Sequence, residues 1–182
     1  MVGRLEADFL ANDIDVRGAN PSPGNMRGGL STLEEKSLGG ISKGGSHPVS
    51  QVVRYGEVPS KGGFVLMDTP GYDIESVSGM SAGGAQVMLF STGRGTPMGN
   101  PIMPVIKVTG NALTFRRMRD NIDFDASGVI AGRSTLGEQA DSLKALLRDV
   151  CDGVPSKAEL LGFDDFAIYH GQEYWCSSEF AS

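Results

Sequence analysis

The sequence predicts an α/β domain in which a mostly parallel sheet carries helices on its faces. Three short apolar runs, at residues 64–67, 86–90 and 105–108, have the length and composition of strands buried on both faces. Segments with helical spacing lie between and after them, and such strand–helix alternation is typical of parallel sheets. The 26 glycines among 182 residues cluster between the apolar runs, which indicates many tight turns rather than disorder.

The first helix is expected after an irregular stretch over residues 12–30, which is rich in proline and glycine. Ser31 or Thr32 begins this helix, since a glutamate stands three residues after each of them, at the spacing of a capping box. Gly39 and the glycine that follows it are expected to end the helix.

A second helix is expected over residues 49–56, because valines and a glycine recur there at helical spacing. Residues 73–83 and 111–118 predict two more helices, the latter with Asn111 as its N-terminal cap.

The longest helix is expected over residues 136–150, where apolar residues keep helical spacing. Thr135 and Glu138 form a capping box at its start. Cys151 lies at the edge of the apolar face, so we expect this cysteine to be buried.

Charge and composition exclude several classes of protein. The formal net charge is −6, and the acidic surplus lies within residues 134–182. An acidic chain without a basic stripe argues against nucleic acid and anionic membrane as partners. No apolar run approaches the roughly 18 residues of a spanning helix. Two cysteines make no disulfide framework, so we expect a cytoplasmic protein. Acidic residues stand near the first methionine, where an export signal would be apolar, so we expect no export signal.

The glycines at 93, 95 and 99 superficially suggest a dinucleotide-binding loop, but their spacing is GxGxxxG rather than GxGxxG. Three prolines between residues 97 and 104 also prevent this loop from opening a helix. The expected layering is therefore Rossmann-like without a dinucleotide fingerprint, and no nucleotide cofactor is expected. What remains is either a tight loop whose amides and Arg94 grip an oxyanion, or a plain strand-exit loop.

Carboxyl ends of parallel strands meet at one edge of a sheet, where ligands bind. Asp68, Thr92 and Asn111 each follow one of the three predicted strands, so we expect them near one another. Glu35 and Lys36 could supply a base or metal ligand and an acid or anion clamp. The alternative is that Glu35 only caps its helix and Lys36 is solvated.

Four blocks of sequence carry a resemblance to a known family. They read NPSPGNMRGGLSTLEEKSLG at residues 20–39, MDTPGYD at 67–73, FSTGRGTP at 90–97 with PVIKVTGN at 104–111, and MRDNIDFDASG at 118–128. These blocks resemble the altronate/galactarate dehydratase family, the hexonate hydro-lyases, whose relatives include the large subunit of sulfolactate sulfo-lyase. The resemblance spans about residues 15–165.

The resemblance implies a lyase that removes water from a sugar acid such as altronate or galactarate, or sulfite from sulfolactate. It implies help from a divalent cation, Fe²⁺ first, with Mn²⁺ or Mg²⁺ as alternatives; no metal ligands are assigned. A non-catalytic acid-binding or assembly module is the remaining alternative. The site residues implied are catalytic Lys36, Glu35 and Asp68, and substrate-binding Asn20, Asn25, Thr92, Gly93, Arg94, Gly95 and Asn111.

Full-length relatives are roughly twice as long, and the chain matches their C-terminal half. A partner is therefore expected, either the N-terminal half or a second subunit, besides the small hydroxy acid. We expect a lead-in over residues 1–30, a domain over 31–165 and a divergent tail over 166–182, which is either a cap or a contact between copies in a homo-oligomer.

Overall fold

The structure is a computed structural model that describes residues 11, 21–27 and 29–169. The chain forms two compact units. Of the described residues, 11, 21–27, 29–52 and 61–66 belong to unit 1, and Val53–Ser60 and Met67–Tyr169 make up unit 2. The domain boundaries expected near residues 30 and 165 remain predictions.

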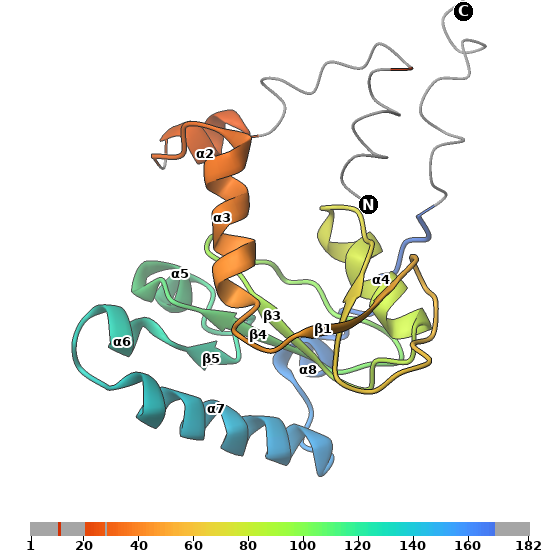
Figure 1. Cartoon of the computed structure of the whole chain (residues 1–182). Helices are drawn as coiled ribbons and strands as arrows, with labels where there is room; N and C mark the ends of the chain where they lie inside the picture. The colour runs from red at the N-terminus through yellow and green to blue at the C-terminus, as the bar shows by residue number, and fades with distance from the viewer. Residues whose placement is uncertain (1–10, 12–20, 28, 170–182) are drawn as a thin grey trace, which may run out of the picture. The chain divides into compact units, whose positions relative to one another are not determined.

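Unit 2 is built on a three-stranded parallel sheet (Figure 1). Its strands are β3 (Met88–Ser91), β4 (Val105–Thr109) and β5 (Phe124–Asp125), in the order β3-β4-β5. Leu89 pairs with Ile106 and Val108 with Phe124. The central strand β4 is the most buried, as its nearly continuous apolar run predicts. The predicted α/β fold with a parallel sheet is confirmed, while the Rossmann-like layering stays a prediction.

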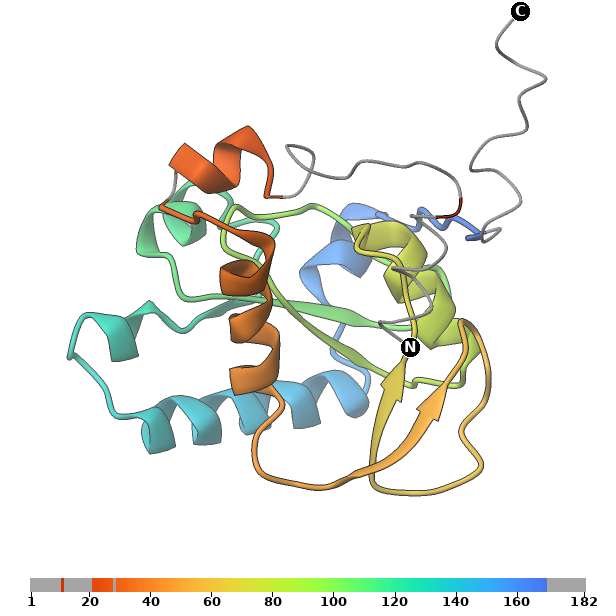
Figure 2. The same cartoon turned by 45° about the horizontal axis from the view of Figure 1, so that its top comes forward.

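Helices surround this sheet. α4 (Asp73–Ala82) packs on one face, where Val77 joins Val105, Met98 and Met103 in the core. Figures 1 and 2 show α4 and α7 at opposite sides of the sheet. The remaining helices of unit 2 are α5 (Ala112–Arg117), α6 (Ser127–Ile130), α7 (Leu136–Cys151) and α8 (Lys157–Leu161).

Several local predictions for unit 2 are confirmed. Asn111 caps α5 by accepting hydrogen bonds from two backbone N–H groups, and Thr135 and Glu138 form both halves of the capping box of α7. The prediction for Cys151 is wrong, because this cysteine is exposed at the end of α7. The apolar stripe of α7 ends at the buried Val150, and one residue further along a helix points about 100° away.

Unit 1 contains α2 (Pro23–Arg27), α3 (Leu33–Lys43) and most of the strands β1 (Val49–Val53) and β2 (Phe64–Met67). The helix predicted over residues 49–56 is wrong, since Val49–Val53 form β1 and residues 54–56 follow it without helical structure. Closely spaced valines fit both the helical repeat and the two-residue repeat of a strand. Their β-branched side chains favour the strand when a second strand is present to pair with. β1 pairs with β2 in a separate two-stranded sheet.

Three further expectations for this region are corrected. The stretch over residues 12–30 is not all irregular, since α2 lies within it. α3 continues through Gly39 and Gly40, because a glycine inside a helix lowers stability by about 1 kcal/mol without ending the helix. Finally, β2 does not join the parallel sheet, so the three predicted strands do not share one edge.

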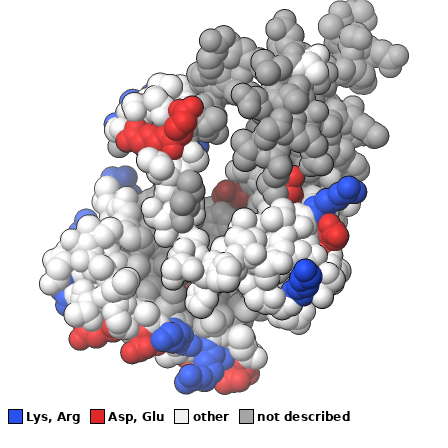
Figure 3. Space-filling model, in the orientation of Figure 1, with Lys and Arg blue, Asp and Glu red and all other residues white. Residues whose placement is uncertain are grey.

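The surface shows both signs of charge over α7. Figure 3 shows acidic and basic side chains interleaved there, at the bottom of the view. They fit the mixed sequence of α7, which carries Glu138, Asp141, Lys144, Arg148 and Asp149. Among the described residues, no helix is long and apolar enough to span a membrane.

Candidate functional site

The strand β3 ends in a tight turn that holds four of the predicted substrate-binding residues, at positions 92–95. The N–H of Thr92 donates to the Val108 carbonyl at 2.9 Å, which continues the parallel ladder by one residue. The Gly95 N–H then donates to Thr92 Oγ1 at 2.9 Å and closes the turn. Gly95 has φ +88°, a backbone conformation that side chains rarely adopt, and a β-carbon there would displace the end of the Met118 side chain, so glycine is favoured at this position.

The ends of β3 and β4 are joined through the carbonyl of Gly93. This oxygen accepts hydrogen bonds from Thr114 Oγ1 at 2.8 Å and from Asn111 Nδ2 at 3.5 Å. Asn111 Oδ1 meanwhile accepts from Leu113 N at 2.9 Å and caps α5. Asn111 therefore positions the turn, and the structure brings it together with Thr92, Gly93 and Gly95.

Arg94 stands at the tip of this turn and is exposed. Within the part of the chain that the structure describes, its guanidinium makes no hydrogen bond or ion pair, and the N–H groups of Gly93 and Arg94 have no acceptor. The Gly95 amide is already bonded to Thr92, so it is not available to a ligand. A planar fork of N–H donors beside two amides suits a carboxylate.

Ser127 and Arg133 lie beyond the end of β5, next to the end of β4, and sequence reasoning missed both. The Ala126 N–H donates to the Thr109 carbonyl at 2.8 Å, which ties the end of β5 to that of β4. Ser127 follows and is buried, and Arg133 Nη2 donates to its hydroxyl at 3.5 Å. Ser127 and Arg133 are six residues apart across α6, a separation that gives no sequence signal.

Asp68 does not lie at the edge of the parallel sheet. It follows β2, which pairs with β1, and its N–H donates to the Val53 carbonyl at 2.9 Å. Its side chain is half-buried. The predicted meeting of Asp68 with Thr92 and Asn111 at one sheet edge is therefore wrong, because strand pairing depends on distant residues. The catalytic role of Asp68 itself stays a prediction.

In unit 1 the structure brings together Asn25 and Lys36. Asn25 Oδ1 accepts hydrogen bonds from Lys36 Nζ at 3.0 Å and from both the N–H and the hydroxyl of Ser22 at 3.1 Å. These bonds tie the ammonium at the first turns of α3 to the start of α2. Asn20 lies outside the described residues.

Glu35 caps α3. Its carboxylate accepts from the Ser31 N–H at 2.8 Å and from the Ser31 hydroxyl, while its own N–H donates to Thr32 Oγ1 at 3.1 Å. The Ser31 hydroxyl and N–H lower the pKa of Glu35. This arrangement satisfies the capping alternative, and a carboxylate with a lowered pKa is a weaker proton acceptor.

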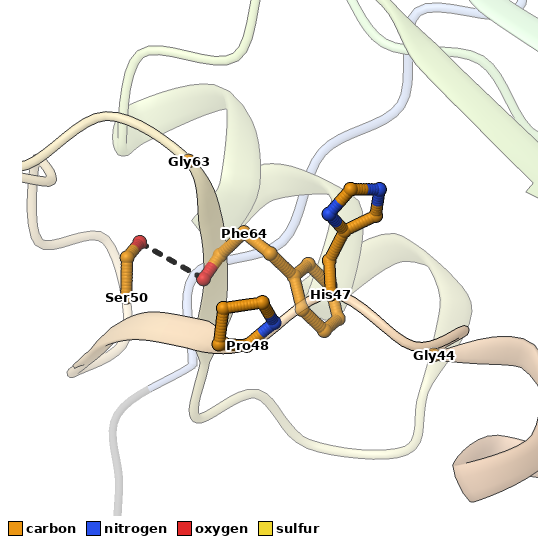
Figure 4. Close-up of a pocket in the computed structure, with 6 residues that line it drawn as sticks. All are labelled: Gly44, His47, Pro48, Ser50, Gly63 and Phe64. Carbon is orange, nitrogen blue, oxygen red and sulfur yellow. Dashed lines mark hydrogen bonds between the residues drawn. The ribbon is translucent and has the colours of Figure 1, made fainter.

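Unit 1 also has a pocket of about 490 Å³ lined by Gly44, His47, Pro48, Ser50, Gly63 and Phe64 (Figure 4). The Ser50 hydroxyl donates to the Phe64 carbonyl at 3.0 Å, and Figure 4 shows the His47 imidazole pointing away from Ser50. No serine–histidine pair forms here, so the pocket offers no activated nucleophile.

A second pocket, of about 460 Å³, lies in unit 2 between the start of α4 and the segment after the Arg94 turn. Its lining includes Asp73, Glu75 and Asp165 together with residues 96–98. Three carboxylates repel an acid anion, so the Arg94 turn is the better candidate for binding a hydroxy acid.

The resemblance implies a divalent cation, which needs a cluster of ligating side chains. Nowhere in residues 21–27 and 29–169 do three His, Cys, Asp or Glu side chains gather in an arrangement that could hold a metal ion. The donor set in this part of the chain therefore does not fit a complete metal shell.

Comparison with known proteins identifies relatives of two kinds. Altronate dehydratase of Bacillus subtilis (strain 168) is 47% identical over 131 residues, which are 72% of this chain and 26% of the relative. Galactarate dehydratase (L-threo-forming) of Escherichia coli (strain K12) is 38% identical over 137 residues, 75% of this chain and 26% of the relative. The beta subunit of (2R)-sulfolactate sulfo-lyase from Chromohalobacter salexigens is 39% identical over 155 residues, 85% of this chain and 40% of the relative.

The chain thus spans between about a quarter and two fifths of the length of these relatives. A family model described as D-galactarate/altronate dehydratase, C-terminal, matches residues 1–173. Because this match covers nearly all of the sequence, including the Arg94 turn, the chain belongs to the D-galactarate/altronate dehydratase C-terminal family.

Proposed function

We propose that the chain is the C-terminal portion of a hydro-lyase that eliminates water from a sugar acid such as altronate or galactarate, and that it binds the substrate carboxylate. The observation that carries the proposal is the Arg94 turn, whose guanidinium and two amides have no partner among the described residues. The names of the dehydratase relatives support the substrate class.

The chemistry explains why such a grip is needed. The proton on the carbon next to a carboxylate is barely acidic, because its removal places negative charge on that carboxylate. Cationic and N–H donors held at fixed positions stabilise this charge as it develops. When the base takes the proton, the electron pair forms the new carbon–carbon double bond, and the β-hydroxyl leaves as water with a proton from a general acid.

Proton transfer is assigned to the predicted catalytic residues Lys36, Glu35 and Asp68. Glu35 is the weakest candidate for the base, since Ser31 lowers its pKa. Lys36 and Asp68 are left for the transfer of protons, and Asn25 orients the Lys36 ammonium. A divalent cation and a cytoplasmic location stay predictions, and no step above is routed through a metal.

A sulfo-lyase subunit is the second candidate. The match to the sulfolactate sulfo-lyase subunit covers 85% of the chain, more than either dehydratase match reported above. Sulfolactate also carries a carboxylate on the carbon that loses its proton, so Arg94 would do the same work, with sulfite as the leaving group.

Calorimetric titration of the 182-residue chain with galactarate, altronate and sulfolactate tests the proposal. Arg94→Lys keeps the charge but loses the planar fork, so we expect binding about tenfold weaker or more in this variant. Arg116→Lys, an exposed arginine on α5, serves as the matched control and should bind like the unmutated chain. Equal affinity in the Arg94 and Arg116 variants would show that the turn does not hold the carboxylate.

Turnover separates the enzyme from the non-catalytic alternative. The chain alone should fold but release little water or sulfite, because elimination needs a base, an acid and a charge stabiliser held together. We expect turnover to appear when the residues that relatives carry beyond the matched region are supplied. Acid binding without turnover in that complete protein would favour a binding or assembly module.

A further inference from the structure

A lysine is buried in the middle of the parallel sheet. Lys107 stands at the centre of β4 and is 0% exposed. Its side chain is on the same face as Val105, two residues earlier, which packs in the core against Val77 of α4. Within the described residues, no carboxylate lies at ion-pair distance from its ammonium.

The ammonium of Lys107 instead binds the backbone of the segment that follows the Arg94 turn. Its Nζ donates to the Met98 carbonyl at 3.0 Å and to the Pro97 carbonyl at 3.4 Å. Pro97 has no N–H and the segment has no regular secondary structure, so its carbonyls depend on such a donor. Lys107 therefore anchors the chain three to four residues after Arg94.

An ordinary core residue would be easier to bury at this position. Desolvation lowers the pKa of Lys107, although the nearby Asp123 carboxylate opposes this effect and Lys157 adds to it. Burial of a charge is unfavourable unless the charge is well hydrogen-bonded. The ammonium supplies what valine or isoleucine cannot, which is a donor that reaches two adjacent carbonyls of a loop.

The loop between β3 and β4 is held at three places. Its start is bonded by Asn111 and Thr114 at the Gly93 carbonyl, and its end by Ser81, whose hydroxyl donates to Asn100 Oδ1 at 3.3 Å. Lys107 holds the middle. Without the middle anchor, Arg94 would lie on a loop fixed only near its two ends.

We propose that Lys107 is a positioning residue that fixes Pro97 and Met98 and thereby holds Arg94 in its acid-binding position. The part of this inference that concerns binding rests on the function proposed for Arg94. The anchoring of the loop by Lys107 does not rest on that function. The anchoring and the acid binding can therefore each be disproved without the other.

Lys107→Met tests the inference, because methionine fills most of the volume and removes the ammonium. Val105→Ala is the matched control, since it weakens the same strand and the same face but leaves the ammonium in place. Hydrogen exchange is followed at Gly95 and Met98, whose N–H groups bond to Thr92 and Thr96 within the loop, and in α7 as an internal reference.

The two variants are compared under conditions in which their global free energies of unfolding are lowered equally. Amide hydrogen exchange at Gly95 and Met98 should then be about tenfold faster in Lys107→Met than in Val105→Ala. Exchange in α7 should be equally slow in both variants. Galactarate or sulfolactate should bind about tenfold more weakly to Lys107→Met than to Val105→Ala. Equal exchange in the two variants would mean that Lys107 is only part of the core and would overturn the proposal.

Two further measurements keep the test decisive. If Lys107→Met does not fold, NMR of the unmutated chain should still show slowly exchanging Lys107 ammonium protons coupled to the Pro97 and Met98 carbonyl carbons. The lack of such couplings would overturn the anchoring. If the unmutated chain binds neither acid, the function proposed for Arg94 fails, while the exchange comparison still decides whether Lys107 holds the loop.

Discussion

The two units of the chain hold their polar groups in different ways. In unit 2, side chains from separate elements bind the backbone of the loop that carries Arg94, as Asn111, Thr114 and Lys107 do. In unit 1, Glu35 binds Ser31 four residues away, and the described side chains of α3 are exposed. A binding turn supported from both β4 and α5 is pre-organised for a ligand, whereas the bonds that Glu35 makes to its near neighbour Ser31 chiefly organise the start of α3.

This difference also appears in what surrounds the glycines. A β-carbon on Gly99 in unit 2 would overlap the Phe163 carbonyl oxygen and come within 3.0 Å of Ala158 Cβ. A β-carbon on Gly39 in α3 would meet no atom of the described residues within 4 Å. The same substitution should therefore have opposite effects at these two positions.

The largest effect is expected for Gly99→Ala. The clash with the Phe163 backbone forces the loop away from α8, so the free energy of unfolding should fall by about 3 kcal/mol. Chemical denaturation measures this change when the unfolding of unit 2 is monitored through the loss of helical structure in α7. A change smaller than that of a typical surface substitution would mean that the loop is loosely packed.

Gly39→Ala is the matched substitution in unit 1 and should raise the stability of α3 by about 1 kcal/mol, because alanine loses less backbone entropy than glycine in a helix. Amide exchange along α3 should slow in this variant. Faster exchange there would show that α3 needs glycine at position 39 for close contact with another part of the protein.

An effect of similar size and opposite sign is expected for Asn111→Ala, which removes the cap of α5 and one of the bonds to the Gly93 carbonyl. Loss of the cap should lower stability by about 1 kcal/mol. Thr135→Ala, which removes the cap of α7, should lower stability by a similar amount. Only the Asn111 variant should also bind the acid more weakly in calorimetry, and equal weakening in both would contradict its role at the turn.

The smallest effect concerns the two capping glutamates, Glu35 in unit 1 and Glu138 in unit 2. Hydrogen bonds from Ser31 and from Thr135 lower the pKa of these carboxylates from the ordinary value of 4.5. Because the pKa is lower in the folded state, each carboxylate stabilises the folded protein. This contribution to the free energy of unfolding is complete above about pH 4.5 and is lost as the pH falls through the folded-state pKa.

Carboxylate NMR titration of both glutamates checks the direction of these shifts. Glu35→Gln and Glu138→Gln should reduce stability above pH 4.5 and approach the unmutated chain in more acidic solution. Titration of either glutamate at or above its ordinary pKa would show that its cap does not persist in solution.

Predictions that depend on neighbouring residues in the sequence succeeded best. The cap of α5 at Asn111 and the capping box of α7 follow from side chains that bind backbone groups two or three residues away. The same signal, a serine three residues before a glutamate, was present at Ser156 and Glu159 and would have identified α8. The wrong predictions concern strands, whose pairing partners are distant in the sequence. They are the helix predicted where β1 lies, and the placement of β2, which precedes Asp68, in the parallel sheet.

The sequence by itself therefore determined the α/β class, the starts of α3, α4, α5 and α7, the turn that carries Arg94 and, through four blocks of resemblance, the family. These follow from local hydrogen bonding and from the pattern of apolar residues. Only the tertiary structure decided that β2 leaves the parallel sheet, that Ser127 and Arg133 meet at the end of β5, and that the buried Lys107 binds the Pro97 and Met98 carbonyls. The physical reason is that a strand's partner, and the direction in which a buried ammonium finds its acceptors, depend on residues that only folding brings near.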